Sequence, residues 1–150
     1  MDGILLIDKP RGWTSFDVVA KVRGILRQAQ KQGSAVRKIR VGHTGTLDPL
    51  ATGLLVLLIG SYTKKAPELT KLDKVYEVTM KLGFISTTGD AEGKITKISD
   101  VQPSPQEIAK NLQFYRGEIM QTPPAYSAIK VGGQRAYKLA REGKEVKIEP

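Results

Sequence analysis

The amino-acid sequence predicts an α+β domain in which a mixed, largely antiparallel sheet is flanked by helices. Residues 54–59 form an uninterrupted apolar run of strand length, and residues 74–82 alternate between apolar and polar side chains. Residues 18–29 instead repeat their apolar side chains at helical spacing. Strands and helices follow one another with hairpin-type spacing, which favours an α+β sheet over a doubly wound one.

The N-terminal segment predicts a strand followed by a helix. Residues 3–7 read as a short strand, and the Lys-Pro-Arg-Gly sequence that follows is typical of a turn. Thr14 or Ser15 can cap the next helix, and Asp17 is favourable in its first turn because a helix N-terminus attracts negative charge.

The central segment predicts a loop, a buried strand and an irregular helix. Residues 41–49 are too rich in Gly and Thr for a helix and are broken by Pro49, so we expect a loop. Residues 54–59 form the buried strand. A short helix opens at Gly60, and Pro67 makes it irregular.

The second half has one strong local signal, a helix start. Ser104 is a cap, Pro105 suits the first helical position, Glu107 can complete a capping box, and Gly117 ends the helix. The other elements expected here are a turn over residues 87–93, a returning strand over 94–98, strands over 118–122 and 127–131, a helix over 135–142 and a strand-like segment over 144–150.

Charge points to a polyanionic partner. Lys and Arg number 24 against 15 Asp and Glu, which gives a net charge of +9. Such an excess favours nucleic acid, because neutralised phosphates release counterions, although a solubilising surface is the alternative. The basic residues cluster over 23–40, 64–65 and 130–147.

Other classes of protein and site are disfavoured. The chain has no Cys, so disulfides and thiolate metal sites are excluded, and we expect a cytoplasmic protein. No apolar run approaches the roughly 18 residues of a membrane span, and no secretory signal is visible at the N-terminus. The single His43 has no clustered carboxylates, so we expect no metal ligand. The nucleotide-binding motifs are missing, and a serine nucleophile with His43 as its base lacks a nucleophile elbow.

The loop over residues 43–53, with Gly42 directly before it, is the candidate site. Its glycines allow close approach of the backbone, and its threonines can bond the loop's own amides. Pro49 disfavours helical geometry at Asp48 and fixes that carboxylate in the loop, where it can serve as acid, base or nucleophile. The alternative is that Asp48 only caps a turn before Pro49.

Residues 42–55 read Gly-His-Thr-Gly-Thr-Leu-Asp-Pro-Leu-Ala-Thr-Gly-Leu-Leu, which resembles the signature loop of the TruB family. These bacterial synthases make pseudouridine in the T-loop of tRNA. Four further segments agree in the same order: residues 3–10 with Gly12, Thr14 and Ser15; residues 74–83 around Tyr76; residues 88–93; and residues 121–130. The resemblance covers essentially all 150 residues.

The resemblance implies a role for four residues. Asp48 matches the essential aspartate, which attacks the uridine or assists cleavage of its glycosidic bond. Tyr76 matches the tyrosine that stacks on the flipped-out uracil, although its strand position alone would suggest a core residue. His43 matches the histidine that contacts the substrate, although alone it would be a loop hydrogen-bonder. Lys9 has a supporting or phosphate-binding role. No cofactor is implied.

The resemblance also implies an RNA surface and an incomplete fold. The candidate phosphate contacts are Lys64, Lys130, Arg135, Lys138 and Arg141; without the resemblance the basic segment over 130–147 would be a solvated face. Family members continue beyond this length with an arginine that pairs with the aspartate, further strands and usually a PUA domain. We therefore expect residues 1–150 to be the N-terminal portion of a catalytic domain, without a PUA domain.

Three functions remain open from the sequence. The first is an isomerase that acts on tRNA and needs neither a membrane nor an obligate protein partner. The second is a catalytically inactive RNA-binding or tRNA-folding module. The third is the related guide-RNA-dependent, dyskerin-like synthase, although Thr44 and the Leu-Ala-Thr of residues 50–52 look more bacterial.

Overall fold

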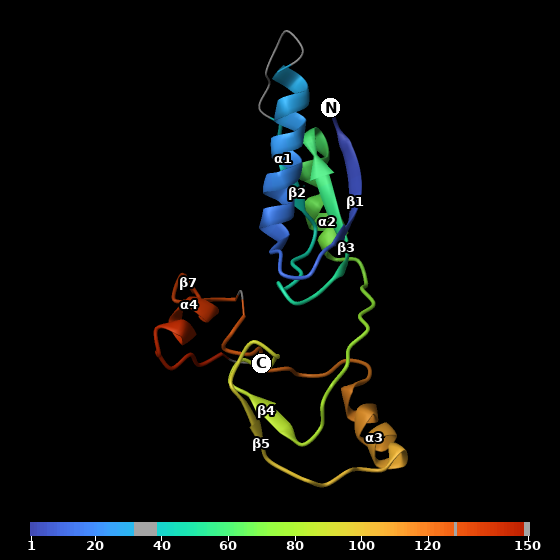
Figure 1. Ribbon diagram of the computed structural model, residues 1–150, viewed down its shortest axis with the longest axis vertical. Coiled ribbons are helices and arrows are strands. Elements are labelled where there is room, and N and C mark those ends of the chain that lie inside the picture. Colours follow the sequence, from blue (N-terminus) through green and yellow to red (C-terminus); the bar gives the residue numbers. More distant parts are fainter. Residues whose placement is uncertain (32–38, 128, 149–150) are drawn as a thin grey trace. The chain divides into compact units, whose positions relative to one another are not determined.

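The computed structural model describes residues 1–31, 39–127 and 129–148, and it divides into two compact units (Figure 1). The first unit is Met1–Tyr76 and the second is Glu77–Pro150. Part of the predicted basic cluster over 23–40 and the end of the strand-like segment over 144–150 lie outside the described residues. Each unit combines helices with antiparallel strands, so the α+β prediction is confirmed.

The first unit is built on a three-stranded sheet with the order β1-β3-β2. The strands are β1 (Gly3–Lys9), β2 (Val41–His43) and β3 (Gly53–Ile59), and both pairings are antiparallel. The apolar run of β3 takes the central position, where both of its edges are hydrogen-bonded. The predicted strands over 3–7 and 54–59 are confirmed, but the predicted loop over 41–49 begins three residues late because its start pairs with β3.

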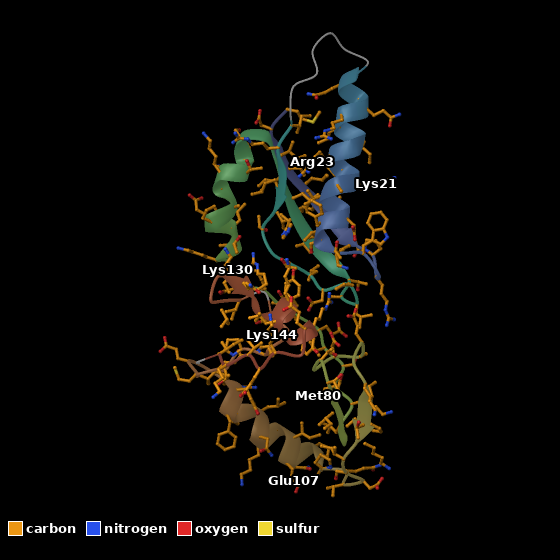
Figure 2. The ribbon with its side chains drawn as sticks, turned by 90° about the vertical axis from the view of Figure 1, so that its left-hand side faces the viewer. Lys21, Arg23, Met80, Glu107, Lys130 and Lys144 are labelled. Atoms are coloured by element: carbon orange, nitrogen blue, oxygen red, sulfur yellow. The ribbon has the colours of Figure 1, made fainter. Side chains whose placement is uncertain are left out.

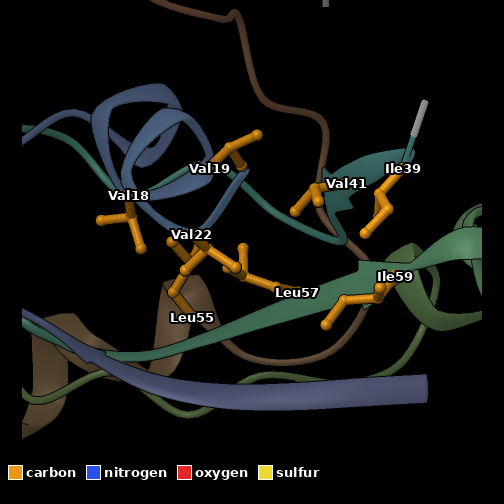
Figure 3. Packing of buried hydrophobic residues seen from close by; sticks show 8 residues of the cluster. All are labelled: Val18, Val19, Val22, Ile39, Val41, Leu55, Leu57 and Ile59. Atoms are coloured by element: carbon orange, nitrogen blue, oxygen red, sulfur yellow. The ribbon is translucent and has the colours of Figure 1, made fainter. Parts of the chain in front are cut away.

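Helix α1 (Ser15–Lys31) covers one face of this sheet (Figure 3). Its apolar stripe packs against β2 and β3, and burial of each Val, Leu or Ile side chain stabilises the fold by about 1.5–3 kcal/mol. The buried core cluster consists of Val18, Val19, Val22, Ile39, Val41, Leu55, Leu57 and Ile59.

The start of α1 decides between the two predicted caps. The Thr14 hydroxyl accepts the Asp17 N–H at 3.1 Å, and the Asp17 carboxylate accepts the Thr14 N–H at 2.8 Å. The carboxylate also accepts the Thr14 hydroxyl proton, and these bonds hold the pKa of Asp17 below its ordinary value. Thr14 is therefore the cap, and Ser15 is left available for another contact.

The opposite face of the sheet is partly uncovered. Ile4 and Leu6 of β1 and Leu54 of β3 share this face, and no described residue covers their side chains enough to bury them. The chain leaves β3 through the 3₁₀ helix η1 (Gly60–Lys65) and helix α2 (Ala66–Thr70), which carries Pro67 in its first turn. The predicted irregular helix is therefore confirmed.

The second unit contains two small hairpins and two helices. Strands β4 (Phe84–Ser86) and β5 (Ile95–Lys97) pair around the predicted turn. Helix α3 (Pro105–Leu112) has the full predicted capping box and continues into η2 (Gln113–Tyr115). Strands β6 (Lys130–Val131) and β7 (Gln134–Arg135) form the other hairpin, followed by α4 (Ala136–Arg141), which confirms the helix expected over 135–142.

Several predicted strands are wrong. Residues 73–81, 118–122 and 144–148 have no regular secondary structure. Of the strand expected over 127–131, the described residues form only β6. A strand needs a neighbour for its backbone N–H and C=O groups, and the described residues provide none for these segments. Residues 74–82 keep the alternation of a strand, but both of its faces are exposed.

Candidate functional site

The candidate site is the loop that joins β2 to β3 (residues 44–52), at one end of the sheet. The Thr44 side chain is buried, and its N–H donates to the Val56 carbonyl at 3.1 Å, which continues the ladder into the loop. The Asp48 carbonyl accepts the Ala51 N–H at 3.0 Å, so residues 48–51 form a β-turn with Pro49 at its second position. The Asp48 side chain is exposed. Asp48 thus opens a turn and also presents its carboxylate to solvent.

Lys9, at the end of β1, supports this loop from inside. Its side chain is completely buried, and its ammonium donates to the carbonyls of Trp13 at 2.7 Å, Pro10 at 3.0 Å and Pro49 at 3.4 Å. All three donors of the ammonium group therefore have a carbonyl partner, which a buried cation requires. These contacts join the turn after β1 to the turn that carries Asp48.

Ser15 makes a second connection, which sequence reasoning missed. Its buried hydroxyl donates to the Leu47 carbonyl at 3.1 Å and accepts the Leu47 N–H at 2.9 Å. The Gly12 N–H also donates to the Pro49 carbonyl at 2.7 Å, and Gly12 has φ +85°, which favours glycine. We call these bonds of Lys9, Gly12 and Ser15 to the loop the loop clamp. The available signal was the pair of hydroxyl residues before α1, since only one can be the cap.

Replacing Ser15 with Ala is expected to lower the free energy of unfolding by about 1–3 kcal/mol, because both backbone polar groups of Leu47 lose their partner in a partly buried position. The measurement is urea unfolding of the chain extended to the length of its relatives. Thr46→Ala is the matched control, because it removes a hydroxyl from an exposed position of the same loop and should change stability by less than about 0.5 kcal/mol. Equal stability of the two variants would contradict the clamp.

His43 is the last residue of β2, directly before the loop. Its backbone is paired with Leu57, and its side chain is half-buried. The Nδ1 atom is buried and has no hydrogen-bond partner among the described residues. Most buried polar atoms in proteins are hydrogen-bonded, so this nitrogen is available to a group that the chain itself does not supply.

Tyr76 is the last residue of the first unit and lies in the segment without regular structure. Its side chain is 63% exposed, so the alternative of a core residue does not hold for the described chain. Among the described residues, Tyr76 forms no side-chain hydrogen bond to the Asp48 loop. Sequence spacing could not have revealed this, because the alternation of residues 74–82 predicts a strand.

The candidate phosphate contacts fall into two groups. Lys64 is exposed on η1 in the first unit. The other four gather in one short segment of the second unit, where Lys130 and Arg135 face each other across the β6–β7 hairpin and Lys138 and Arg141 lie on α4. The hairpin turns at two glycines with positive φ, as a tight two-residue turn requires. The four cations are therefore assembled by local structure alone.

Two kinds of feature are absent from the described residues. Among residues 1–31, 39–127 and 129–148, no group of three or more His, Asp or Glu side chains is placed to hold a metal ion. None of the described helices has the length and apolar character needed to cross a bilayer.

Comparison with known proteins identifies the class. Residues 18–150 match the TruB family pseudouridylate synthase N-terminal domain. The chain is 47% identical over its full length to tRNA pseudouridine synthase B of Gluconacetobacter diazotrophicus, of which it covers 46%. It is 48% identical to the protein of that name from Clostridium acetobutylicum, over 97% of the chain and 47% of the relative. The corresponding protein of Opitutus terrae is 46% identical over the whole chain and is covered to 58%.

The chain spans about half the length of the curated relatives it matches. The α+β fold fits part of a pseudouridine synthase domain, as predicted. Within that class, the chain belongs to the TruB family.

Proposed function

We propose that this chain carries the catalytic carboxylate of a tRNA pseudouridine synthase that isomerises a T-loop uridine. The observation that carries the proposal is the Asp48 loop, because it combines an exposed carboxylate with a backbone fixed by the buried Lys9 and Ser15. A reactive group held by a rigid support is positioned before the substrate arrives. The names of the relatives point to tRNA as the substrate.

The proposed reaction balances without a cofactor. Asp48 attacks the uridine or assists cleavage of its N-glycosidic bond, the base turns, and a carbon–carbon bond to C5 replaces the carbon–nitrogen bond. The proton on C5 is lost and N1 gains one, so product and substrate are isomers. A uridine inside a folded T-loop must be flipped out first, and Tyr76 is the proposed stacking partner, worth roughly 1–3 kcal/mol.

The other site residues have supporting roles in this proposal. His43 contacts the substrate, and its unpartnered buried Nδ1 is the atom that such a contact would satisfy. Lys9 supports the loop and does not meet phosphate, because its ammonium is buried and fully bonded to carbonyls. We further propose a cytoplasmic location, as the cysteine-free sequence predicts.

The test is release of tritium from tRNA labelled at uridine C5, by the chain extended to the length of its relatives. Turnover on free tRNA supports the proposal. Binding of tRNA without turnover would instead identify an inactive RNA-binding or tRNA-folding module. Turnover that appears only with a guide RNA complex would identify the guide-dependent class.

The basic segment of the second unit is proposed to contact RNA phosphates. Lys130→Glu should weaken tRNA binding and reduce the slope of log affinity against log salt by about one, because one phosphate contact is lost. Lys110→Glu is the matched control, since Lys110 is equally exposed in the same unit but lies on α3. Filter binding between low and physiological salt measures both slopes. An affinity that salt does not change would contradict an RNA surface here.

A further inference from the structure

A small cavity with an unusual lining lies at the junction of α1 and β2, within the first unit. Its volume is about 220 Å³, and Arg23, Arg27, Ile39, Arg40 and Val41 line it. Pockets for organic ligands are typically about 300–1,000 Å³ and mostly apolar. This cavity is smaller, and three of its five lining residues are arginines, so its chemistry suits a small anionic group.

Local structure brings the three arginines together. Arg23 and Arg27 are one helical turn apart and therefore share a face of α1. Arg40 directly precedes β2, and its carbonyl accepts the Gly60 N–H at 2.8 Å. The Arg23 guanidinium donates to the Val41 carbonyl at 3.1 Å, which fixes its direction.

The stretch of sequence that lines this cavity contains no acidic residue. The sequence has no Asp or Glu between Asp17 and Asp48, and Asp17 is occupied by Thr14. Within residues 1–31, 39–127 and 129–148, none of the three arginines has an ion pair. Like charges one turn apart destabilise a helix, so an anion between them would stabilise it. The basic residues of this acid-free stretch are Lys21, Arg23, Arg27, Lys31, Arg37, Lys38 and Arg40.

We propose that the Arg23–Arg27–Arg40 cavity binds a phosphodiester group of the RNA backbone; this inference rests on the proposed function in tRNA modification. Guanidinium groups match phosphate oxygens with paired hydrogen bonds. The lining side chains offer donors and aliphatic surface but no acceptors, which suits the acceptor oxygens of a phosphodiester.

The site is near enough to the Asp48 loop to serve the same RNA. At 1.5 Å per residue, Arg23 and Arg27 lie roughly 12 and 18 Å along α1 from Ser15, which belongs to the loop clamp. Duplex DNA carries about one phosphate charge per 1.7 Å of axis, so a nucleic acid of similar charge density offers several phosphates over this distance. The cavity thus gives the substrate a second anchor that does not touch the reacting base.

The experiment compares two neutralised side chains on the same helix. Lys21 and Arg23 leave α1 on different sides, and Lys21 does not line the cavity (Figure 2). Lys21→Ala is therefore the matched control for Arg27→Ala, because both residues are exposed and both variants lose one charge. In the chain extended to its relatives' length, Arg27→Ala should weaken tRNA transcript binding about tenfold at low salt and reduce the salt slope by about one.

Lys21→Ala should change the affinity less than threefold. Equal effects of the two variants, or an unchanged salt slope for Arg27→Ala, would overturn the proposal. Arg40→Ala is the second variant and should behave as Arg27→Ala does. A different result would assign the cavity to a small anion instead. In that case Arg27→Ala would weaken the binding of inorganic phosphate but leave the affinity for tRNA unchanged.

Tritium release distinguishes failure of the proposed function from failure of the cavity proposal. At saturating tRNA, Lys21→Ala should keep the tritium-release rate of the parent, because Lys21 does not line the cavity. A parent that binds tRNA with the predicted Arg27 dependence but releases no tritium would refute the synthase proposal alone.

Discussion

Asp48→Asn, in the chain extended to the length of its relatives, is expected to reduce tritium release from tRNA labelled at uridine C5 by at least about 10³-fold. Asn keeps the size of the side chain but can act neither as a nucleophile nor as a base. The affinity for tRNA should change little, because an amide and a carboxylate occupy the same space. Filter binding and tritium release on the same preparation measure the two quantities separately.

The structure makes this substitution a clean test. The Asp48 side chain is exposed, and the loop is held by the Asp48 carbonyl, Lys9 and Ser15 rather than by the carboxylate. Asn should therefore leave the fold intact. Asp8→Asn is the matched control, because it removes an equally exposed carboxylate from β1 and should keep full activity. Turnover by Asp48→Asn within tenfold of the parent would refute the catalytic role.

The isolated 150 residues are expected to be inactive on tRNA and prone to association. The sheet leaves Ile4, Leu6 and Leu54 exposed on its uncovered face. Val75 is 100% exposed and Met80 70% exposed in the segment that alternates like a strand. Contiguous apolar surface and strands with unpaired edges favour contacts between molecules. Light scattering should therefore report species larger than a monomer.

The inactivity follows from the surroundings of Asp48. In the described part of the chain, its carboxylate has no cationic partner and faces solvent. Catalytic carboxylates act in sites that exclude water and orient them, and the family resemblance implies an arginine partner beyond these residues. Adding the missing half in trans, or restoring it in cis, should recover tritium release. Robust turnover by a monomer of these 150 residues would contradict the prediction.

The sequence predicted best the elements whose signals are local. Ser104 and Glu107 form both bonds of a capping box, which needs only four consecutive residues. The apolar run of β3 is central and buried, as its length and composition require. The strand predicted over residues 74–82 is wrong, although the alternation there is cleaner. A strand also depends on a partner strand, which the pattern does not specify.

The candidate site shows the same division. Asp48 could be singled out from Gly, Thr and Pro spacing, since those residues act on the backbone nearby. The loop clamp could not be predicted, because Ser15 and Leu47 are far apart in the sequence and their contact depends on how α1 packs. The arginine cavity lies between these cases: the acid-free stretch is visible in the sequence, but only the fold places Arg40 beside Arg23 and Arg27.

The loop clamp also has a consequence for local unfolding. The Leu47 amide is bonded to Ser15 and the Gly12 amide to Pro49, so neither can exchange its hydrogen with solvent while the clamp is closed. Because Lys9 bridges the turn after β1 and the turn at Pro49, we expect the loop and the first turn of α1 to open together, as one cooperative unit. The amide hydrogens of Gly12 and Leu47 should then exchange with similar protection, and more slowly than those of an independent surface loop.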